Sequence, residues 1–201
     1  MLTQNLGYPR IGTHRELKKA CEQYWQGKIT VDELVKTGKD LCTKHWKLQK
    51  DAGIDLIPSN DFSFYDHILD MSLTVGAIPK RYHELVNDKS RHDLDLYFAM
   101  ARGYQKNGVD VTAMEMTKWF DTNYHYIVPE FYKDQKFEYF SRKVVDGYLF
   151  AKSQGIQTKP VITGLVSYLL LGKEKEEGFN KLDLANHLLP VYKKILSELK
   201  S

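Results

Sequence analysis

Apolar side chains that recur every three or four residues predict a helix near each end of the chain. In the N-terminal helix they share one face and are Leu17, Ala20, Cys21 and Tyr24. In the last helix, which we expect to begin at Asp183, they are Ala185, Leu188, Leu189, Tyr192, Ile195, Leu196 and Leu199. Pro190 interrupts this second stripe and is expected to kink the helix. Each apolar face needs a neighbouring layer to cover it, which predicts a layered globular fold.

Three Thr-x-x-Glu sequences predict the starts of helices. In such a capping box the threonine and glutamate side chains bond backbone N–H groups that the first turn leaves unpaired. The three pairs are Thr13 with Glu16, Thr30 with Glu33, and Thr112 with Glu115. The second of these helices should continue to Gly53, a residue suited to ending it. Further helices are expected to open within residues 62–67 and to cover residues 94–104 and 143–154.

Short apolar runs between these helices predict buried strands. They cover residues 54–58, 124–128 and 160–164. Residues 76–93 are polar and contain Pro79, so we interpret them as connecting structure. Strands that alternate with long helices are typical of βα units around a parallel sheet. The sequence therefore predicts an α/β fold with parallel strands and long connecting helices.

The expected strands are too few to close a barrel. A (βα)8 barrel usually takes about 250 residues, whereas this chain has 201. We therefore expect an incomplete TIM-type barrel. An incomplete sheet leaves backbone groups unpaired at its edges, which favours self-association of the chain.

Composition and charge narrow the possible partners. The chain is 42% hydrophobic and 27% charged, which is ordinary for a globular protein. Its net charge of +3 is too small and too evenly spread to indicate a nucleic-acid or membrane surface. No apolar run approaches the roughly 20 residues of a membrane span, and the first residues do not resemble a secretory signal. We therefore expect a cytoplasmic protein with no nucleic-acid or membrane partner.

Residue types that bind metals are scattered along the chain. Cys21 and Cys42 lack CxxC spacing and are expected to be small core residues. The histidines show neither HExxH nor paired Cys/His spacing, and they are His14, His45, His67, His83, His92, His125 and His187. The sequence therefore predicts no metal site in this chain.

Two cations lie where a helix disfavours them. Arg15 and Lys18 stand at the expected start of the first helix, where unpaired N–H groups already carry partial positive charge. Their spacing of three residues places both on one face, so they could bind one anion together with N–H groups of the first turn. A solvated basic helix face is the commoner explanation of an arbitrary Arg-x-x-Lys. Spacing alone leaves both interpretations open.

An aromatic stretch over residues 116–126 is a second candidate for binding. It contains Lys118, Asn123 and His125, and it could line a pocket for a planar ligand. Aromatic residues at this density more often form core, and a histidine on a strand is more often structural than catalytic. Both interpretations of this stretch remain open.

Three aspartates surround the end of the first expected strand, where barrel enzymes place catalytic groups. They are Asp55, Asp61 and Asp66. A helix cap at Asp61 and a surface position for Asp66 are equally simple explanations. We therefore assign no catalytic residue in this chain.

Several segments, in one order along the chain, resemble the opening of cobalamin-independent methionine synthases. The most distinctive is Glu115-Met116-Thr117-Lys118-Trp119-Phe120, which runs into Asn123-Tyr124-His125-Tyr126. The likeness extends over essentially all 201 residues, and its other parts are residues 6–12, 15–20, 52–58, 60–66, 128–130, 159–161 and 188–192. Leu165 departs from the family pattern, in which we expect proline after Gly164.

The resemblance implies a methyltransferase that moves the N5-methyl group of 5-methyltetrahydropteroyl-polyglutamate to homocysteine. It also implies two (βα)8 barrels, of which residues 1–201 would form the N-terminal part of the first. In the family a zinc ion, held by the C-terminal barrel, stabilises the homocysteine thiolate. That barrel and its zinc ligands are absent from this sequence. We therefore expect the chain alone to be inactive and to bind no cofactor itself.

By resemblance, the positions that contact the folate polyglutamate are Arg15, Glu16, Leu17, Lys18 and Lys118. A glutamate tail carries several carboxylates, which arginine can bind bidentately and lysine can meet as a point charge. The expected partners are thus folate polyglutamate and the C-terminal barrel of the same enzyme. One alternative is a stand-alone, non-catalytic anion-binding or assembly subunit that docks a separate catalytic barrel. Another is an unrelated βα protein whose basic helix face is simply solvated.

Overall fold

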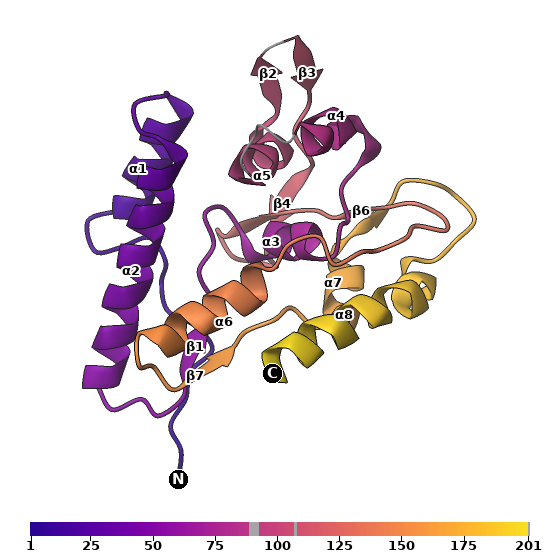
Figure 1. Cartoon of the computed structure of the whole chain (residues 1–201). Helices are drawn as coiled ribbons and strands as arrows, with labels where there is room; N and C mark the ends of the chain where they lie inside the picture. The colour runs from indigo at the N-terminus through magenta and orange to yellow at the C-terminus, as the bar shows by residue number, and fades with distance from the viewer. Residues whose placement is uncertain (89–92, 107, 201) are drawn as a thin grey trace. The chain divides into compact units, whose positions relative to one another are not determined.

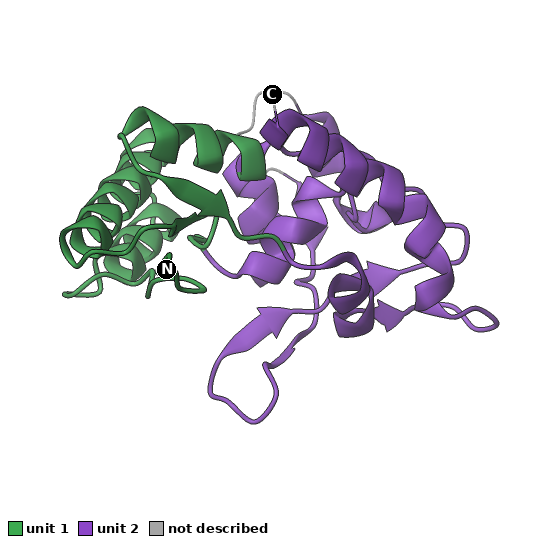
Figure 2. Cartoon of the chain, turned by 90° about the horizontal axis from the view of Figure 1, so that it is seen from below, with its two compact units in different colours: residues 1–64, 144–162 green, residues 65–143, 163–201 purple. Residues whose placement is uncertain are grey.

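The computed structural model describes residues 1–88, 93–106 and 108–200. The chain is a mixed helix and strand protein that divides into two compact units (Figures 1 and 2). Unit 1 comprises residues 1–64 and 144–162, and unit 2 comprises residues 65–143 and 163–201. None of the described helices is long and apolar enough to cross a membrane.

Unit 1 is built around one pair of parallel strands. Its elements are α1 (Glu16–Trp25), α2 (Val31–Asp51), β1 (Ile57–Ser59), α6 (Lys143–Ser153) and β7 (Thr158–Pro160). Strands β1 and β7 run parallel, and α1 lies beside α2 (Figure 1). A buried cluster of Trp46, Ile57, Ala151 and Ile156 joins α2, β1 and α6. The Trp46 indole also donates to the Pro58 carbonyl at 3.0 Å, so helix and strand are fixed together.

Unit 2 combines helices with three strand pairs. Its helices are α3 (His67–Thr74), the 3-10 helix η1 (Lys80–Tyr82), α4 (His83–Asn87), α5 (Asp93–Arg102), α7 (Leu165–Leu171), the 3-10 helix η2 (Lys181–Leu184) and α8 (Ala185–Lys200). Its strands are β2 (Tyr104–Lys106), β3 (Val109–Val111), β4 (Met116–Lys118), β5 (His125–Ile127), β6 (Glu130–Phe131) and β8 (Lys173–Glu174). Strands β6 and β8 pair in parallel, whereas β2–β3 and β4–β5 are antiparallel hairpins.

The strand predictions are confirmed in kind, with boundaries that shift by a few residues. The expected strands correspond to β1, β5 and β7. Parallel pairing is confirmed for β1–β7 and β6–β8, but β5 pairs antiparallel with β4. Among the described residues the parallel strands form separate pairs and no closed barrel. The expected connecting segment 76–93 contains η1 and α4, and its residues 89–92, with His92, lie outside the described part.

One of the three predicted capping boxes is confirmed. The Thr30 hydroxyl accepts a hydrogen bond from the Glu33 N–H, and the Glu33 carboxylate accepts one from the Thr30 N–H. The box at Thr13 is wrong, because Arg15 precedes α1 and no side chain caps that helix. Thr30 therefore starts α2 as the sequence predicts, whereas α1 begins by another arrangement.

The third box is also wrong, because Thr112 begins no helix. It follows β3, and its carbonyl accepts hydrogen bonds from the Tyr82 hydroxyl at 2.5 Å and from Arg81 Nε at 3.4 Å. Further along the chain, Met116–Lys118 form β4 and pair with β5 instead of continuing a helix. Long-range hydrogen bonds thus override the local helix signal at this position.

The apolar stripe predicted for the last helix is partly wrong. Leu188 and Ile195 are buried in α8 as expected, but Leu189 and Leu196 are 43% and 57% exposed. Val191, which the prediction omitted, is buried instead. The buried face of α8 is narrow. The predicted apolar stripe is wider than this face, so some of its leucines are exposed to solvent.

We expect Thr30→Ala to lower the free energy of unfolding by about 1 kcal/mol, because the first turn of α2 loses its capping hydroxyl. Thr13→Ala is the matched control and should leave it unchanged, since Thr13 is exposed and caps no helix. Urea unfolding followed by circular dichroism measures both variants. Equal effects of the two substitutions would contradict this assignment of the caps.

Candidate functional site

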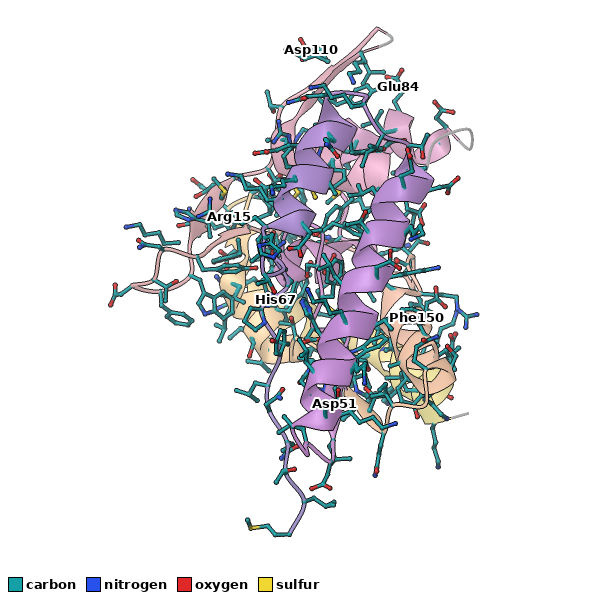
Figure 3. The ribbon with its side chains drawn as sticks, turned by 90° about the vertical axis from the view of Figure 1, so that its left-hand side faces the viewer. Arg15, Asp51, His67, Glu84, Asp110 and Phe150 are labelled. Atoms are coloured by element: carbon teal, nitrogen blue, oxygen red, sulfur yellow. The ribbon has the colours of Figure 1, made fainter. Side chains whose placement is uncertain are left out.

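The loop before α1 holds Arg15 in an unusual backbone conformation. Arg15 lies in the left-handed region, with φ 60° and ψ 37°, which costs a residue other than glycine about 1 kcal/mol or more. Two backbone hydrogen bonds close the turn around it, from the Arg15 N–H to the Gly12 carbonyl and from the Leu17 N–H to the Ile11 carbonyl, both at 3.2 Å. The helix therefore begins directly after a fixed turn that presents Arg15 (Figure 3).

The Glu16 carboxylate binds back onto this turn. It accepts a hydrogen bond from the His14 N–H at 2.8 Å and lies 3.8 Å from the Lys44 ammonium. Hydrogen bonds from its own backbone N–H and from that of His14 lower the pKa of Glu16. Gly12 has φ +84° and leaves no space for a Cβ beside this carboxylate. Glu16 is thus ionised and occupied in holding the turn.

The cations at the start of α1 are exposed. Among the described residues the Arg15 guanidinium forms no ion pair, and the Lys18 N–H has no hydrogen-bond partner. The Lys18 ammonium lies 3.7 Å from Glu22, but both side chains are exposed and such pairs contribute little. Leu17 is only 1% exposed, so its side chain belongs to the core. Arg15 and Lys18 are therefore accessible to an anion.

The Asp61 side chain and the Ser63 backbone, which follow β1, hold the loop before α1 in place. The Tyr8 N–H donates to Asp61 at 2.8 Å, and Arg10 donates to the Ser63 carbonyl at 3.1 Å. The Tyr8 ring lies 4.6 Å from the ring of His45, whose pKa burial lowers. A small cavity at this place is lined by Tyr8, Arg10, Cys42, His45, Trp46, Gln49, Asp61 and Phe62. Contacts within unit 1 therefore fix the loop that leads to Arg15.

Lys118 lies in unit 2, on the exposed side of β4. It pairs with His125 across the β4–β5 hairpin, and its ammonium forms no ion pair with any residue that the structure describes. The Trp119 N–H donates to the Tyr124 carbonyl at 2.7 Å and closes the end of the hairpin. Lys118 is therefore an accessible cation on a defined strand.

The aromatic stretch over 116–126 is part of this hairpin. Its rings contact one another, with Trp119 lying 5.3 Å from Phe120 and 5.7 Å from Tyr126 between ring centroids. Tyr126 is buried, whereas Phe120 is 75% exposed and has φ 51°. His125 Nδ1 lies 3.1 Å from the Asn123 carbonyl, a local contact within the turn. One end of the stretch is therefore core and the other is surface.

The three aspartates have three different environments. Asp55 is exposed and accepts hydrogen bonds from the backbone and hydroxyl of Thr3, and the backbone bond lowers its pKa. Asp61 bonds the loop before α1 and caps no helix, so the cap considered for it is wrong. Asp66 is only 1% exposed, so the surface position considered for it is also wrong.

Asp66 is the N-cap of α3 and reaches further than a cap needs to. Its Oδ1 accepts from the N–H groups of Ile68 and Leu69 at 2.8 and 3.0 Å, and its Oδ2 accepts from the Ile127 N–H at 3.0 Å. Burial raises the pKa of Asp66 to about 7, although the three hydrogen bonds oppose the shift. An aspartate directly before a helical segment is a recognisable cap signal, but its bond to Ile127 has no signature in the sequence.

The next residues to consider are the cysteines and the other potential metal ligands. Cys21 is buried, Cys42 is half-buried, and neither forms a disulfide. Within residues 1–88, 93–106 and 108–200, no group of three or more His, Cys, Asp and Glu side chains is arranged to hold a metal ion. The zinc ion implied by the resemblance has no ligand set here, so we assign no metal-dependent step to these residues.

The fold and site define an α/β domain that exposes cations at the start of a helix and on a hairpin. The family described as "Cobalamin-independent synthase, N-terminal domain" matches residues 2–201. The chain therefore belongs to the cobalamin-independent synthase family.

Relatives named 5-methyltetrahydropteroyltriglutamate–homocysteine methyltransferase match along the whole chain. The protein from Flavobacterium johnsoniae is 68% identical over 200 residues, and that from Cytophaga hutchinsonii is 62% identical over 201, each covering 100% of this chain. The Saccharomyces cerevisiae protein is 55% identical over 207 residues and covers 98% of this chain. In each case the chain spans 26% of the relative's length.

We expect the stability of the protein to depend on pH through Asp66. The folded pKa of about 7 lies above the unfolded value near 4. The protonated Asp66 side chain therefore contributes fully to the free energy of unfolding below about pH 4. This contribution, up to roughly 4 kcal/mol, is lost as the pH rises through 7. Asp66→Asn, which cannot titrate, is the reference: the difference in unfolding free energy between wild type and this variant should fall over that range. A difference that stays constant with pH would contradict the buried carboxyl.

Proposed function

We propose that this chain is the N-terminal part of a methyltransferase that moves the methyl group of 5-methyltetrahydropteroyl-polyglutamate to homocysteine. The name of its relatives describes that reaction with the triglutamate. The chain spans about a quarter of their length, so the proposal concerns one part of the enzyme. Residues 1–201 then form the opening of the first of two barrels, to which they contribute the parallel pair β1–β7 and the parallel pair β6–β8. The partner is the C-terminal barrel of the same enzyme, in the cytoplasm.

The contribution of this part is to bind the glutamate tail of the folate. The observation that supports this is the start of α1, where Arg15 is exposed in the turn and Lys18, in the first turn of the helix, has an exposed ammonium and an unpaired N–H. Arginine and lysine next to a free helical N–H suit carboxylates, because the cations and the helix dipole act in the same direction. Lys118 supplies a further cation of the same kind from β4.

Glu16 and Leu17 serve this site indirectly in our proposal. The Glu16 carboxylate is bonded to the His14 N–H and so keeps the turn closed without facing the ligand. The buried Leu17 side chain anchors the first turn of α1 in the core, and its N–H is already bonded to Ile11. Arg15 and Lys18 are therefore the side chains of this segment that would touch the tail, while their two neighbours fix the backbone.

We expect Arg15→Glu and Lys18→Glu each to weaken binding of pteroyltriglutamate by roughly 1–3 kcal/mol, the value of a charge-assisted contact. Binding of pteroylmonoglutamate should change less, because it carries fewer carboxylates. Isothermal titration calorimetry at two salt concentrations measures both, and the difference should shrink at high salt.

Lys36→Glu is the matched control for the lysine. It makes the same change of charge on a neighbouring helix and breaks an equivalent exposed pair, Lys36–Asp40 at 2.7 Å. It should leave the affinity for pteroyltriglutamate unaltered. If Lys18→Glu behaves like Lys36→Glu, the basic face of α1 is simply solvated and the proposed site is wrong.

We expect the 201-residue chain alone to form no methionine from homocysteine and 5-methyltetrahydropteroyltriglutamate, even with added zinc. The reason is that the described residues offer neither a metal-ligand set nor a group assigned to methyl transfer. The assay is detection of methionine by mass spectrometry. Measurable turnover would contradict the division of labour that we propose.

A further inference from the structure

The first turn of α3 contacts the β4–β5 hairpin at both of its ends. At the open end, Asp66 accepts the Ile127 N–H at 3.0 Å. At the closed end, the His67 ring lies 5.3 Å from the ring of Trp119 and 6.2 Å from that of Tyr124. Two consecutive residues thus hold a hairpin that lies some 50 to 60 positions further along the chain. Lys118 stands between these two contacts.

The Asp66 carboxylate has two acceptor oxygens, and capping α3 uses only one of them. One oxygen, Oδ1, accepts both N–H groups of the α3 first turn, which is the whole of the capping function. The other, Oδ2, accepts from Ile127 in β5 and from no further group among the described residues. A serine would cap the helix equally well but has a single oxygen, so it could not also reach the strand. The second oxygen therefore has a role outside the helix.

The backbone that carries this carboxylate is itself fixed. The Tyr97 hydroxyl, from α5, accepts the N–H groups of Tyr65 and Asp66 at 2.9 and 3.1 Å. Tyr97 is buried, and burial raises its pKa well above the ordinary value, so its hydroxyl remains protonated. Asp66 is thus held from one side by α5 and holds β5 on the other.

The position of β5 determines that of Lys118. Ile127 pairs with Met116, and His125 pairs with Lys118, in one antiparallel register. A lysine side chain is long and flexible, so the fold can control only where its Cα stands and which way the strand faces. A hairpin held at both ends fixes these two properties, whereas a free two-stranded hairpin is at best marginally stable.

We propose that Asp66 is a positioning residue, which through its bond to Ile127 holds the β4–β5 hairpin and places Lys118 for the glutamate tail. The proposal rests on the function proposed above for Lys118. Asp66 itself touches no ligand in this scheme. The part that concerns the hairpin alone can be tested without any ligand.

The first test is amide hydrogen exchange of the 201-residue chain. In Asp66→Ser the cap is kept and the bond to Ile127 is lost, so amides of the hairpin, with Ile127 foremost, should exchange at least about tenfold faster. Tyr168→Phe is the control, because it removes another buried hydrogen bond to α3, from Tyr168 to Ser72 at 2.9 Å. It should leave hairpin exchange unchanged. Equal exchange of the hairpin in Asp66→Ser and wild type overturns the proposal.

Wild-type protein gives a measurement that does not depend on a variant folding. Its Ile127 amide should be among the best protected in the hairpin, and fast exchange there overturns the proposal. Asp66→Asn provides a second variant of nearly equal size. Its single amide oxygen can serve the cap or Ile127 but not both, so it should also loosen the hairpin.

The second test is binding of pteroyltriglutamate. Lys118→Ala and Asp66→Ser should each weaken it by about threefold to tenfold, and the double variant should be no weaker than Lys118→Ala alone. Additive losses, or a loss in Lys118→Ala without one in Asp66→Ser, overturn the positioning role. If Lys118→Ala binds as tightly as wild type, the function proposed for Lys118 fails, and with it the link from the hairpin to the ligand. The exchange experiment then still decides whether Asp66 holds the hairpin.

Discussion

Backbone N–H and carbonyl groups that regular structure leaves unpaired need hydrogen-bond partners, and in each unit some of these bonds are made by the short segment after β1. In unit 1, Asp61 accepts the Tyr8 N–H, and the Ser63 carbonyl accepts Arg10. In unit 2, Asp66 accepts three N–H groups from α3 and β5. The loop that leads to Arg15 and the hairpin that carries Lys118 both depend on this one stretch of chain.

The charged groups of the protein fall into two classes with different consequences. Arg15, Lys18 and Lys118 are exposed, so water screens them and they contribute little to stability. Asp66 is buried, so its charge is costly and its hydrogen bonds are consequential. Under the proposed function, substitutions in the first class would change ligand binding without unfolding the chain. Those of the second class act on structure first and on binding only through it.

The function proposed above, and not family membership by itself, would give these features a common purpose. A polyglutamate tail is long and flexible, so a protein that binds it benefits from cations fixed at separate points on rigid elements. Arg15 follows a turn closed by two backbone hydrogen bonds, and Lys118 stands on a strand held at both ends of its hairpin. In both cases the local structure fixes the backbone of a residue whose side chain is flexible.

The sequence by itself determined the helices with strong periodicity, the short apolar strands and the cap at Thr30, because these depend on neighbours within a few residues. It also indicated Arg15 and Lys18 as a pair, while the role expected for Lys118 rested more on resemblance than on its spacing. Tertiary structure decided the rest. It left Thr13 and Thr112 without helices to cap, turned Arg15 into the left-handed region and paired β4 antiparallel with β5.

The position of Asp66 shows the physical reason for this division. Its place before α3 is a local signal, and a cap could be expected from it. Its burial and its bond to Ile127 join residues 61 positions apart, and no local pattern encodes such a contact. Periodicity and capping preferences report which face of an element is apolar and where the element begins. Which distant backbone group a side chain meets is settled only when the elements pack.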